Sequence, residues 1–445
     1  FLINSSSVLT FSLQYLKQSD VPLYHKIVNG DYYKYQFDPQ QRTLFYSRLE
    51  SYYKSRFVNK LNWTFSYQKS LETRLKQRTA HADTYTDNDE VKTFGANLEV
   101  LSKIATFWKV SSGIEFYHDK VGSNTIITEA ASNQVTMIRG LYPNDSHYSS
   151  LALYSLHSFQ FNRLIVTAGL RYNSVQLTIE DNLFGISKIN PTALIGNLGL
   201  NFKLNKNIRF VASSNTSFRA PNINDVSSFG IADFRYEIPN YDLKSEKSIN
   251  LEIGFKAQFQ NSDIAIHGYI MKLNDLISNV PTTFEGQEVI DGLQVYQRVN
   301  TNEAIVKGFE IEGNIKLMEK LFASGFLIYT HGQNQSANEP MRRIPPVNGR
   351  MSLRYEWSPA FQIRTDWIYA GSQSRLSRGD ISDDRIANGG TSGWSVIDLL
   401  ASYQTKKHRI NIGVQNVLDQ VYRMHGSGVD GLGRSLWVSF QASIF

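Results

Sequence analysis

A period of two in the apolar residues is the feature that most constrains the fold of this chain, and it recurs along its whole length. Apolar side chains occupy every second position in Leu9–Tyr15, Leu164–Tyr172 and Ile249–Ala257. This alternation predicts strands with one apolar and one polar face, either in a soluble sandwich or in a membrane barrel. No stretch approaches the roughly 18 consecutive apolar residues of a membrane-spanning helix, which excludes a helical membrane protein.

The lengths of the connections separate these two folds, because short links alternate strictly with long polar stretches. Short links are expected near residues 54–59, 102–105, 162, 205–207, 260–262, 319, 358–359 and 405–407. Long loops are expected near residues 17–40, 76–90, 119–145, 179–190, 221–244, 276–297, 332–346, 371–393 and 419–433. Outer-membrane barrels have short periplasmic turns and long extracellular loops, so the pattern predicts an antiparallel transmembrane β-barrel of roughly 18 strands. Phe1 and Phe445 would then both lie on the periplasmic side.

Composition agrees with this prediction. Aromatic residues make up 13% of the chain, as suits the girdles of a membrane barrel, and the absence of cysteine suits an oxidising compartment. The formal net charge is +6, but Lys and Arg are scattered singly or in pairs. This scatter argues against a nucleic-acid partner and indicates a weak attraction for anionic ligands or lipopolysaccharide. No linker or second composition is present, so residues 1–445 are expected to form one domain.

Several short motifs carry a family resemblance. They are SFRAP at 217–221, then Leu243, Glu246, Glu252 and Gly254, then Asn300 with GFE at 308–310, RRIPP at 342–346 and NIGVQNVLDQVY at 411–422. In this order they resemble the barrel of TonB-dependent outer-membrane receptors. DVPLYHKI at 20–27, followed by YQFDPQQRTLFY at 35–46, resembles the haem and siderophore receptors of that group.

The resemblance implies a receptor in the outer membrane of a Gram-negative bacterium that takes up a scarce nutrient, a ferric siderophore or haem. The implied partners are the TonB energy-coupling complex, reached through a plug and a TonB box, the barrel assembly machinery and outer-membrane lipid. Phe445 resembles the signal read by that machinery, although it has the opposite parity to the apolar run Leu436–Ile444.

We expect the chain to be amino-terminally truncated, with the plug absent and about 18 strands present of a probable 22. Phe1 opens a sequence without an initiator Met, a basic segment or a cleavage site. The strands at Leu9–Leu16 and Leu436–Phe445 would then lose their neighbours.

Four residues are predicted to bind the ligand: Arg219, Arg235, Tyr236 and Tyr241. Arg219 has an alternative role, holding a carboxylate of a loop or of the plug. Haem receptors of the family carry a histidine in the loop after FRAP, and this loop has none, so no axial ligand can be assigned.

The other motif residues have structural interpretations. Asn416, Asp419 and Tyr422 are expected to organise a turn, and Gly254 and Gly308 to lie where a neighbouring side chain crosses the backbone. The nine histidines show no metal spacing, and no catalytic motif stands out, so we expect no enzyme, no cofactor and no metal site. Two alternatives to the receptor remain open: a passive 18-stranded porin, and a structural or adhesive barrel.

Overall fold

The computed structural model describes residues 2–232, 235–301 and 303–443. Its internal contacts divide the chain, for which we expected one domain, into two compact units. Unit 1 comprises Phe1–Leu198, Asn215–Ile249 and Leu273–Asn302, and unit 2 comprises Gly199–Ser214, Asn250–Lys272 and Glu303–Phe445.

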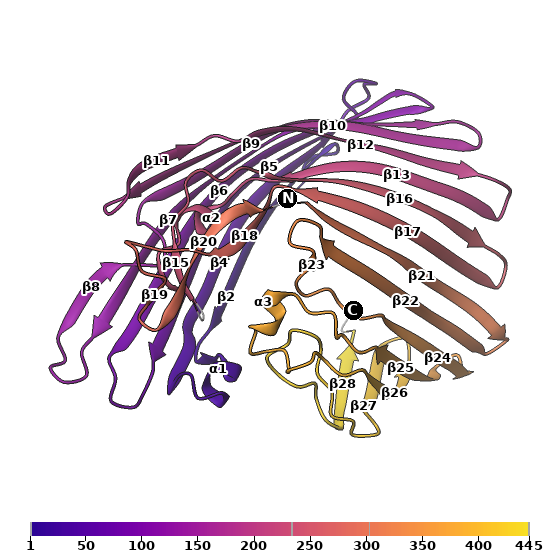
Figure 1. The fold of residues 1–445 in the computed structure, drawn as a ribbon. Coiled ribbons are helices and arrows are strands. Elements are labelled where there is room, and N and C mark those ends of the chain that lie inside the picture. Colours follow the sequence, from indigo (N-terminus) through magenta and orange to yellow (C-terminus); the bar gives the residue numbers. More distant parts are fainter. Residues whose placement is uncertain (1, 233–234, 302, 444–445) are drawn as a thin grey trace. The chain divides into compact units, whose positions relative to one another are not determined.

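Unit 1 is built on antiparallel strands, most of them long, that lie side by side (Figure 1). They are β1 (Leu2–Asn4), β2 (Ser7–Gln18), β3 (Val21–Pro22), β4 (Lys34–Tyr52), β5 (Lys60–Gln77), β6 (Thr84–Ala105), β7 (Trp108–Thr128), β8 (Val135–Arg139), β9 (Ser146–Gln160), β10 (Leu164–Asp181) and β11 (Gly185–Ile189), with a short helix α1 (Tyr24–Val28). Four further strands have residues in both units: β12 (Thr192–Lys203), β13 (Ile208–Arg219), β16 (Glu246–Gln258) and β17 (Ser262–Asn274).

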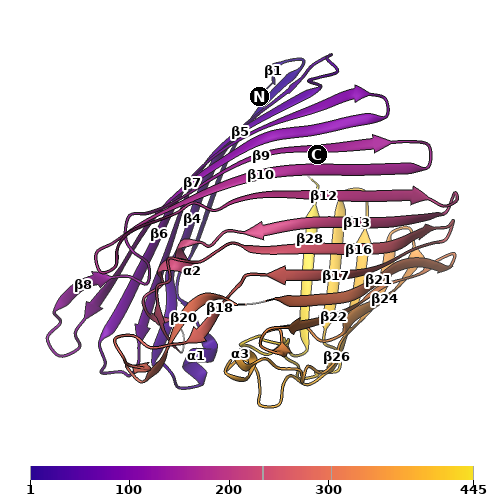
Figure 2. The same cartoon turned by 45° about the horizontal axis from the view of Figure 1, so that its top comes forward.

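A second, five-stranded sheet of unit 1 is formed by long loops. It contains β14 (Gly230–Ala232), β15 (Arg235–Ile238), β18 (Leu276–Pro281), β19 (Val289–Ile290) and β20 (Leu293–Thr301), and helix α2 (Ile223–Ser227) precedes it. Strands β15 and β20 are parallel, although they come from different loops. Figure 2 shows α2, β18 and β20 grouped together.

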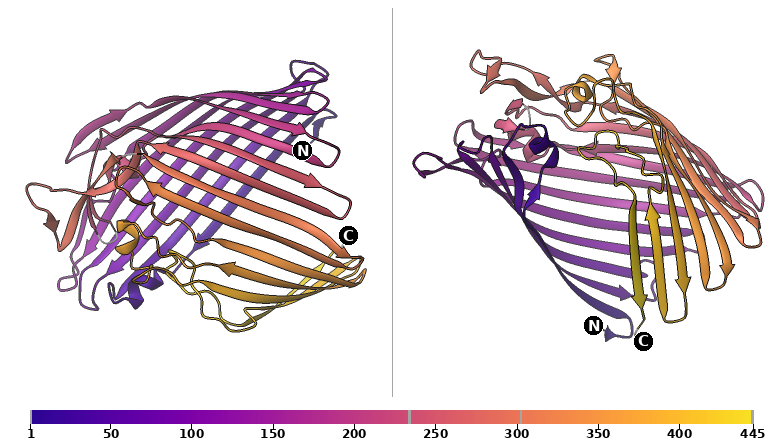
Figure 3. Two further views of the ribbon diagram at one scale, coloured as in Figure 1. Left: turned by 45° about the vertical axis from the view of Figure 1, so that its right-hand side comes forward. Right: turned by 90° about the horizontal axis from the view of Figure 1, so that it is seen from below.

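Unit 2 continues the hairpin pattern, and its strands also lie side by side (Figure 3, brown to yellow). They are β21 (Ala304–Met318), β22 (Leu321–Asn334), β23 (Glu339–Pro340), β24 (Asn348–Ser358), β25 (Phe361–Ala370), β26 (Trp394–Gln404), β27 (His408–Gln415) and β28 (Ser435–Ala442), with helix α3 (Arg378–Ile381) between β25 and β26.

Among the described residues, eighteen strands of the main sheet have eight or more residues, in agreement with the predicted number. The links between them alternate between short and long as predicted, except that the expected long link between β5 and β6 has shrunk to residues 78–83 and is no longer than the short link at 53–59. In unit 1, Tyr52 N–H beside the first short link donates to Ser6 O (2.8 Å), and in unit 2, Ser443 N–H donates to Lys407 O (2.8 Å) in the last. The residues next to each chain end therefore lie at the short-link end of their own unit. Phe1 and Phe445 lie outside the described residues.

The two predicted edge strands each pair with a neighbour inside their own unit. Strand β2 pairs with β4 along its whole length in unit 1, and β28 pairs with β27 in unit 2. The expected absence of about four strands concerns the relation between the units and stays a prediction.

The strands reach farther toward the long links than we predicted. Residues 76–90 were expected to be a loop, but β5 and β6 extend into them and leave only 78–83 as the link. Residues 119–128, also expected to be loop, continue β7. Where both faces of a strand meet water, apolar alternation disappears while the backbone pairing persists, so a pattern of side chains cannot detect such a strand. The expected link at 102–105 lies instead at 106–107, beside a register shift between Lys103 and Ala105.

The two faces of the unit 1 sheet differ as the alternation predicts. On the apolar face, Phe45, Tyr67 and Phe94 are direct cross-strand partners, and all three are exposed. On the polar face, side chains pair with one another, for example Arg171 with Glu115 (2.6 Å). No helix among the described residues is long and apolar enough to cross a membrane.

Candidate functional site

A cavity of about 1150 Å³ lies in unit 1, at the long-link ends of its strands. Its floor is the polar face of the sheet, where Arg74, Asp87 and Thr125 are direct cross-strand partners on β5, β6 and β7. Its remaining walls come from β8 and the link that follows it, from the end of β10, and from Phe229 with the first two residues of β14. The site is thus built on the strand extensions that the sequence pattern did not reveal.

Ion pairs fix the floor of the cavity. Arg74 bonds Asp89 (2.6 Å) and Lys76 bonds Asp87 (2.6 Å). The hydroxyl of Thr125 also donates to Asp87 (2.8 Å). Because each carboxylate has two or more donors, these side chains are held in position and their charges are largely compensated.

A second ion pair closes the wall beside β10. Arg139 Nη2 donates to Asp181 (2.7 Å), whose side chain is fully buried. Asp181 also accepts hydrogen bonds from Leu183 N–H (2.9 Å) and from the hydroxyl of Tyr241 (3.3 Å). Burial alone would raise the pKa of Asp181, but the bonds from Arg139 and from the backbone outweigh it and lower that pKa. Asp181 therefore stays ionised and orients Arg139.

Aromatic rings form a further wall of the cavity. Phe229 packs edge-on against Tyr236 (ring centroids 5.6 Å apart), Phe184 (5.1 Å) and Phe284 (5.7 Å). The guanidinium of Arg139 lies over Phe229, 5.5 Å from its centroid. Burial raises the pKa of Tyr236, so its hydroxyl remains a neutral hydrogen-bond donor. The wall thus combines ring surfaces with one oriented cation.

The loop that carries this wall is held by its helix. Asn222 and Asp225 form a capping box at the start of α2. Arg219 pairs with Asp225 (2.5 Å) and with Glu246, and so joins the ends of β13 and β16 to the helix. The hydrogen bond that Arg219 donates to Glu246 is the main cause of a raised pKa of Arg219. This geometry matches the structural alternative for Arg219.

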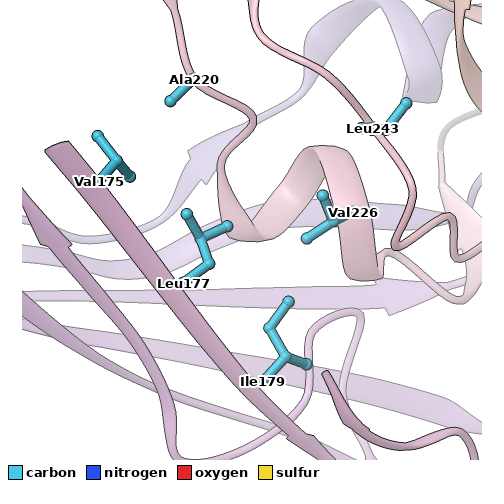
Figure 4. Close-up of a cluster of buried hydrophobic side chains, with 6 residues drawn as sticks. All are labelled: Val175, Leu177, Ile179, Ala220, Val226 and Leu243. Carbon is cyan, nitrogen blue, oxygen red and sulfur yellow. The ribbon is translucent and has the colours of Figure 1, made fainter. Parts of the chain in front are cut away.

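An apolar cluster fixes the same loop to the sheet (Figure 4). It consists of Val175, Leu177 and Ile179 on β10, Ala220 after β13, Val226 on α2 and Leu243. Each large buried side chain contributes roughly 1.5–3 kcal/mol relative to an exposed one, so this contact dominates the docking of the loop.

The four predicted ligand residues do not come together. Only Tyr236 lines the cavity. Tyr241 lies behind the wall and donates to Asp181, and Arg235 pairs with Glu237 (3.0 Å). Arg219 lies at the base of the loop, as described above. A direct role in ligand binding stays a prediction for all four.

Several lining residues were missed by the sequence reasoning. Lys76, Arg139 and Asp181 lie in stretches interpreted as loops, and Arg74 lies just before one of them. The only sequence signal was their position in long polar segments, which is shared by dozens of other residues.

The charged side chains and the possible metal ligands of the cavity lining limit its chemistry. The lining contains four cationic side chains, Arg74, Lys76, Arg78 and Arg139, and six carboxylates, Asp83, Asp87, Asp145, Glu180, Asp181 and Asp291. No histidine is among the described lining residues. Across the described part of the chain, no three His, Cys, Asp or Glu side chains are grouped so as to hold a metal ion.

The motif residues in unit 2 have the structural roles that we expected. A Cβ atom at Gly254 would collide with the ring of His267, and one at Gly308 with Tyr269. Asn416 has a positive φ of 48° and bonds the backbone of Gln420 and Leu432. These motifs therefore stabilise crossings and turns.

Both units consist of antiparallel strands joined as hairpins, which is the strand pattern of a membrane β-barrel. Residues 4–417 match the family described as "TonB dependent receptor-like, beta-barrel", and the chain belongs to this family. The fold is therefore the antiparallel β-barrel that the sequence predicted.

Known relatives support the same assignment. The chain is 24% identical to TonB-dependent heme receptor A of Haemophilus ducreyi, over 67% of this chain and 46% of that protein. It is 21% identical to the vitamin B12 transporter BtuB of Vibrio cholerae, over 87% of this chain and 56% of that one. The chain thus spans about half the length of these relatives. Among solved structures, the copper transporter OprC superposes with a TM-score of 0.84 over 99% of this chain and 69% of its own, at 15% identity.

Proposed function

We propose that this chain is the barrel of a TonB-dependent receptor in the outer membrane of a Gram-negative bacterium, and that it takes up a ferric siderophore or haem. Family membership supports the class of protein, and the cavity of about 1150 Å³ in unit 1 carries the ligand argument. Ordinary small-molecule sites have about 300–1,000 Å³, so this cavity suits a bulky ligand.

In this proposal the ligand lies against the aromatic wall. Phe229 and Tyr236 offer ring surfaces to a planar chelate. Arg139 lies beside them, and because its N–H groups all donate within the protein, it would attract an acidic group of the ligand through its charge alone. Arg219, Arg235 and Tyr241 hold the loop that presents Tyr236, and direct contact of these three with the ligand stays a prediction. Since the carboxylates outnumber the cations, a ligand with several negative charges would need further cationic groups outside this cavity.

The barrel contains no energy source, so uptake depends on the TonB complex acting through a plug and a TonB box. The barrel assembly machinery would insert the protein, and outer-membrane lipid would cover the apolar face. The relatives named above are receptors and transporters, which supports a role without catalysis.

A passive porin of 18 strands is the second candidate, and the strand number alone favours it. The family match favours the receptor, and nothing specific favours an adhesive barrel.

Titration of haem and of a panel of ferric siderophores against the full-length protein tests the proposal. We expect one of them to quench tryptophan fluorescence with micromolar or tighter affinity. Tyr236→Ala should weaken that binding about tenfold, in line with the cost of losing one stacked ring. Tyr24→Ala, an exposed tyrosine on α1, is the matched control. Equal affinity of both variants and the wild type would place the ligand elsewhere.

A further inference from the structure

The basic groups in the cavity of unit 1 are almost all compensated inside the protein. Three of the four cations of its lining are held in ion pairs: Arg74 with Asp89 (2.6 Å), Lys76 with Asp87 (2.6 Å) and Arg139 with Asp181 (2.7 Å). The fourth, Arg78, has its guanidinium over the ring of Tyr32, 5.4 Å from the centroid. An anionic ligand would gain a bond from a paired cation only by displacing its carboxylate, which would then lose its partner.

The acidic groups of the same lining are compensated less completely. Besides the two carboxylates of the pairs above, Asp145 contacts Lys120 (2.8 Å). In the described part of the chain, the other three lining carboxylates, Asp83, Glu180 and Asp291, form no ion pair. Three carboxylates and one guanidinium are thus left without an ionic partner, so the uncompensated charge of the cavity is negative.

Two of these carboxylates lie on links between strands. Asp83 is in the link between β5 and β6, where it accepts a hydrogen bond from Ala130 N–H (3.0 Å), and Asp291 is in the turn between β19 and β20. Glu180 is exposed and alternates along β10 with the buried Asp181, so its side chain faces away from that wall of the cavity. Asp83 and Asp291, which we call the unpaired aspartates, therefore remain as the carboxylates that can act on a ligand.

Aromatic rings of the lining add to this negative potential. The ring of Tyr85 is exposed on the floor, and that of Tyr236 belongs to the aromatic wall. The face of such a ring carries partial negative charge and attracts an ammonium group. The charge of Asp291 also acts at this wall, because after burial it is the next cause of the raised pKa of Tyr236, ahead of the opposing effect of Arg139. A cationic group in the cavity would thus be attracted both by rings and by carboxylates.

A ligand that fills the cavity removes water from the unpaired aspartates, and its own charge decides what this costs. A carboxylate that loses water without gaining a partner raises the free energy of the complex. A neutral ligand leaves this cost uncompensated, and an anionic ligand adds repulsion to it. An ammonium group instead offers each carboxylate a charge-assisted hydrogen bond.

We infer that the cavity selects an iron chelate that carries a cationic group, and that Asp83 and Asp291 determine this selection. A ferric trihydroxamate with one free ammonium group is a chelate of this class. The inference rests on the proposed function, because it takes the cavity as the ligand site. It narrows the substrate class to chelates without an excess of negative charge.

The test uses full-length protein in a neutral detergent at low ionic strength, with affinities measured by tryptophan quenching. The two probes are a linear ferric trihydroxamate that ends in an ammonium group and the same chelate with that nitrogen acetylated. The wild type should bind the ammonium form about tenfold more tightly than the acetylated form. Asp83→Asn combined with Asp291→Asn should reduce this preference to about twofold or less, and Asp83→Glu combined with Asp291→Glu should retain it. Asp242→Asn, at an exposed position outside the cavity lining, is the matched control and should leave the preference unchanged.

Equal affinity of the wild type for the two probes would overturn the inference, as would an unchanged preference when both aspartates are replaced by asparagine. Tighter binding of haem or of a ferric tris-catecholate, which both carry negative charge, would overturn the inference alone and leave the proposed uptake standing. If no chelate of either charge bound, the proposed function would fail and the inference with it. Heat modifiability on gels confirms that each variant is folded.

Discussion

Two long loops of this protein each carry a short capped helix, and different forces hold them. In unit 1, α2 is docked by the apolar cluster around Leu177 and Val226, both fully buried. In unit 2, α3 is docked by Asp383, which accepts hydrogen bonds from Arg342, Arg343 and Arg385. In unit 1 the helix is docked by apolar contacts, and the ionic side chains line a cavity. In unit 2 the arginines instead bond one buried carboxylate, that of Asp383.

The largest effect in this comparison is expected from Leu177→Ala. Removing a fully buried leucine should lower the free energy of unfolding by about 3 kcal/mol, because the cavity left behind adds to the lost transfer energy. Urea unfolding followed by tryptophan fluorescence measures it. Leu418→Ala, at an exposed position in unit 2, is the control and should leave the midpoint unchanged. An equally small loss of unfolding free energy in both variants would show that the apolar cluster does not hold the α2 loop.

Asp383→Ala tests the ionic contacts that hold the loop of α3. It leaves three arginines without their shared carboxylate, and we expect a loss of roughly 2–3 kcal/mol, below that of a fully buried pair because the arginines are partly exposed. Asp430→Ala, which breaks the exposed pair with Arg423, should have no measurable effect on the urea midpoint. If the two substitutions had the same effect, Asp383 would not anchor α3.

Asp181→Asn probes the cavity wall, with an expected loss of roughly 1–2 kcal/mol from the bonds to Arg139 and Tyr241. The pKa of Asp181 is lower in the folded protein than the value of about 3.9 in an unfolded chain. Its stabilisation is therefore complete above about pH 4 and is lost as the pH falls through the folded-state pKa. Unfolding curves between pH 5 and pH 2.5 should be flatter for the variant. If the unfolding free energy of the variant and of the wild type depended on pH in the same way, this would argue against the ion pair of Asp181 with Arg139.

The smallest effect on stability is expected at His425, beside the loop that carries α3. Burial and then Arg343 lower the pKa of His425, and its Nδ1 lies 2.9 Å from the hydroxyl of Thr391. A histidine with a lowered pKa stabilises the fold fully above about pH 6.5 and less as the pH falls below that value. The wild type should thus lose a little stability between pH 7 and pH 5, and His425→Gln should not. Parallel profiles for the two proteins would show that His425 does not titrate in this range.

The sequence predicted the strands that have one apolar face, and it failed where that contrast ends. The sequence located β5 between the expected links near 54–59 and 76–90. It missed the continuation to Gln77, because polar side chains occupy both faces there.

The candidate site followed the same rule. Motif residues such as Arg219 and Asn416 were recognised, but they hold loops and turns. Arg139 and Asp181 were not recognised, because they are far apart in the sequence and come together only when distant segments pair. A motif of neighbouring residues cannot predict such a contact.

The central claim is that this barrel takes up its ligand with energy from TonB. Uptake of radiolabelled iron, supplied as the ferric siderophore or haem that binds best, measures this directly in iron-limited cells that express the full-length protein. The account predicts uptake in cells with TonB and background levels in cells without it. Equal uptake in both strains would contradict the account and favour a passive pore.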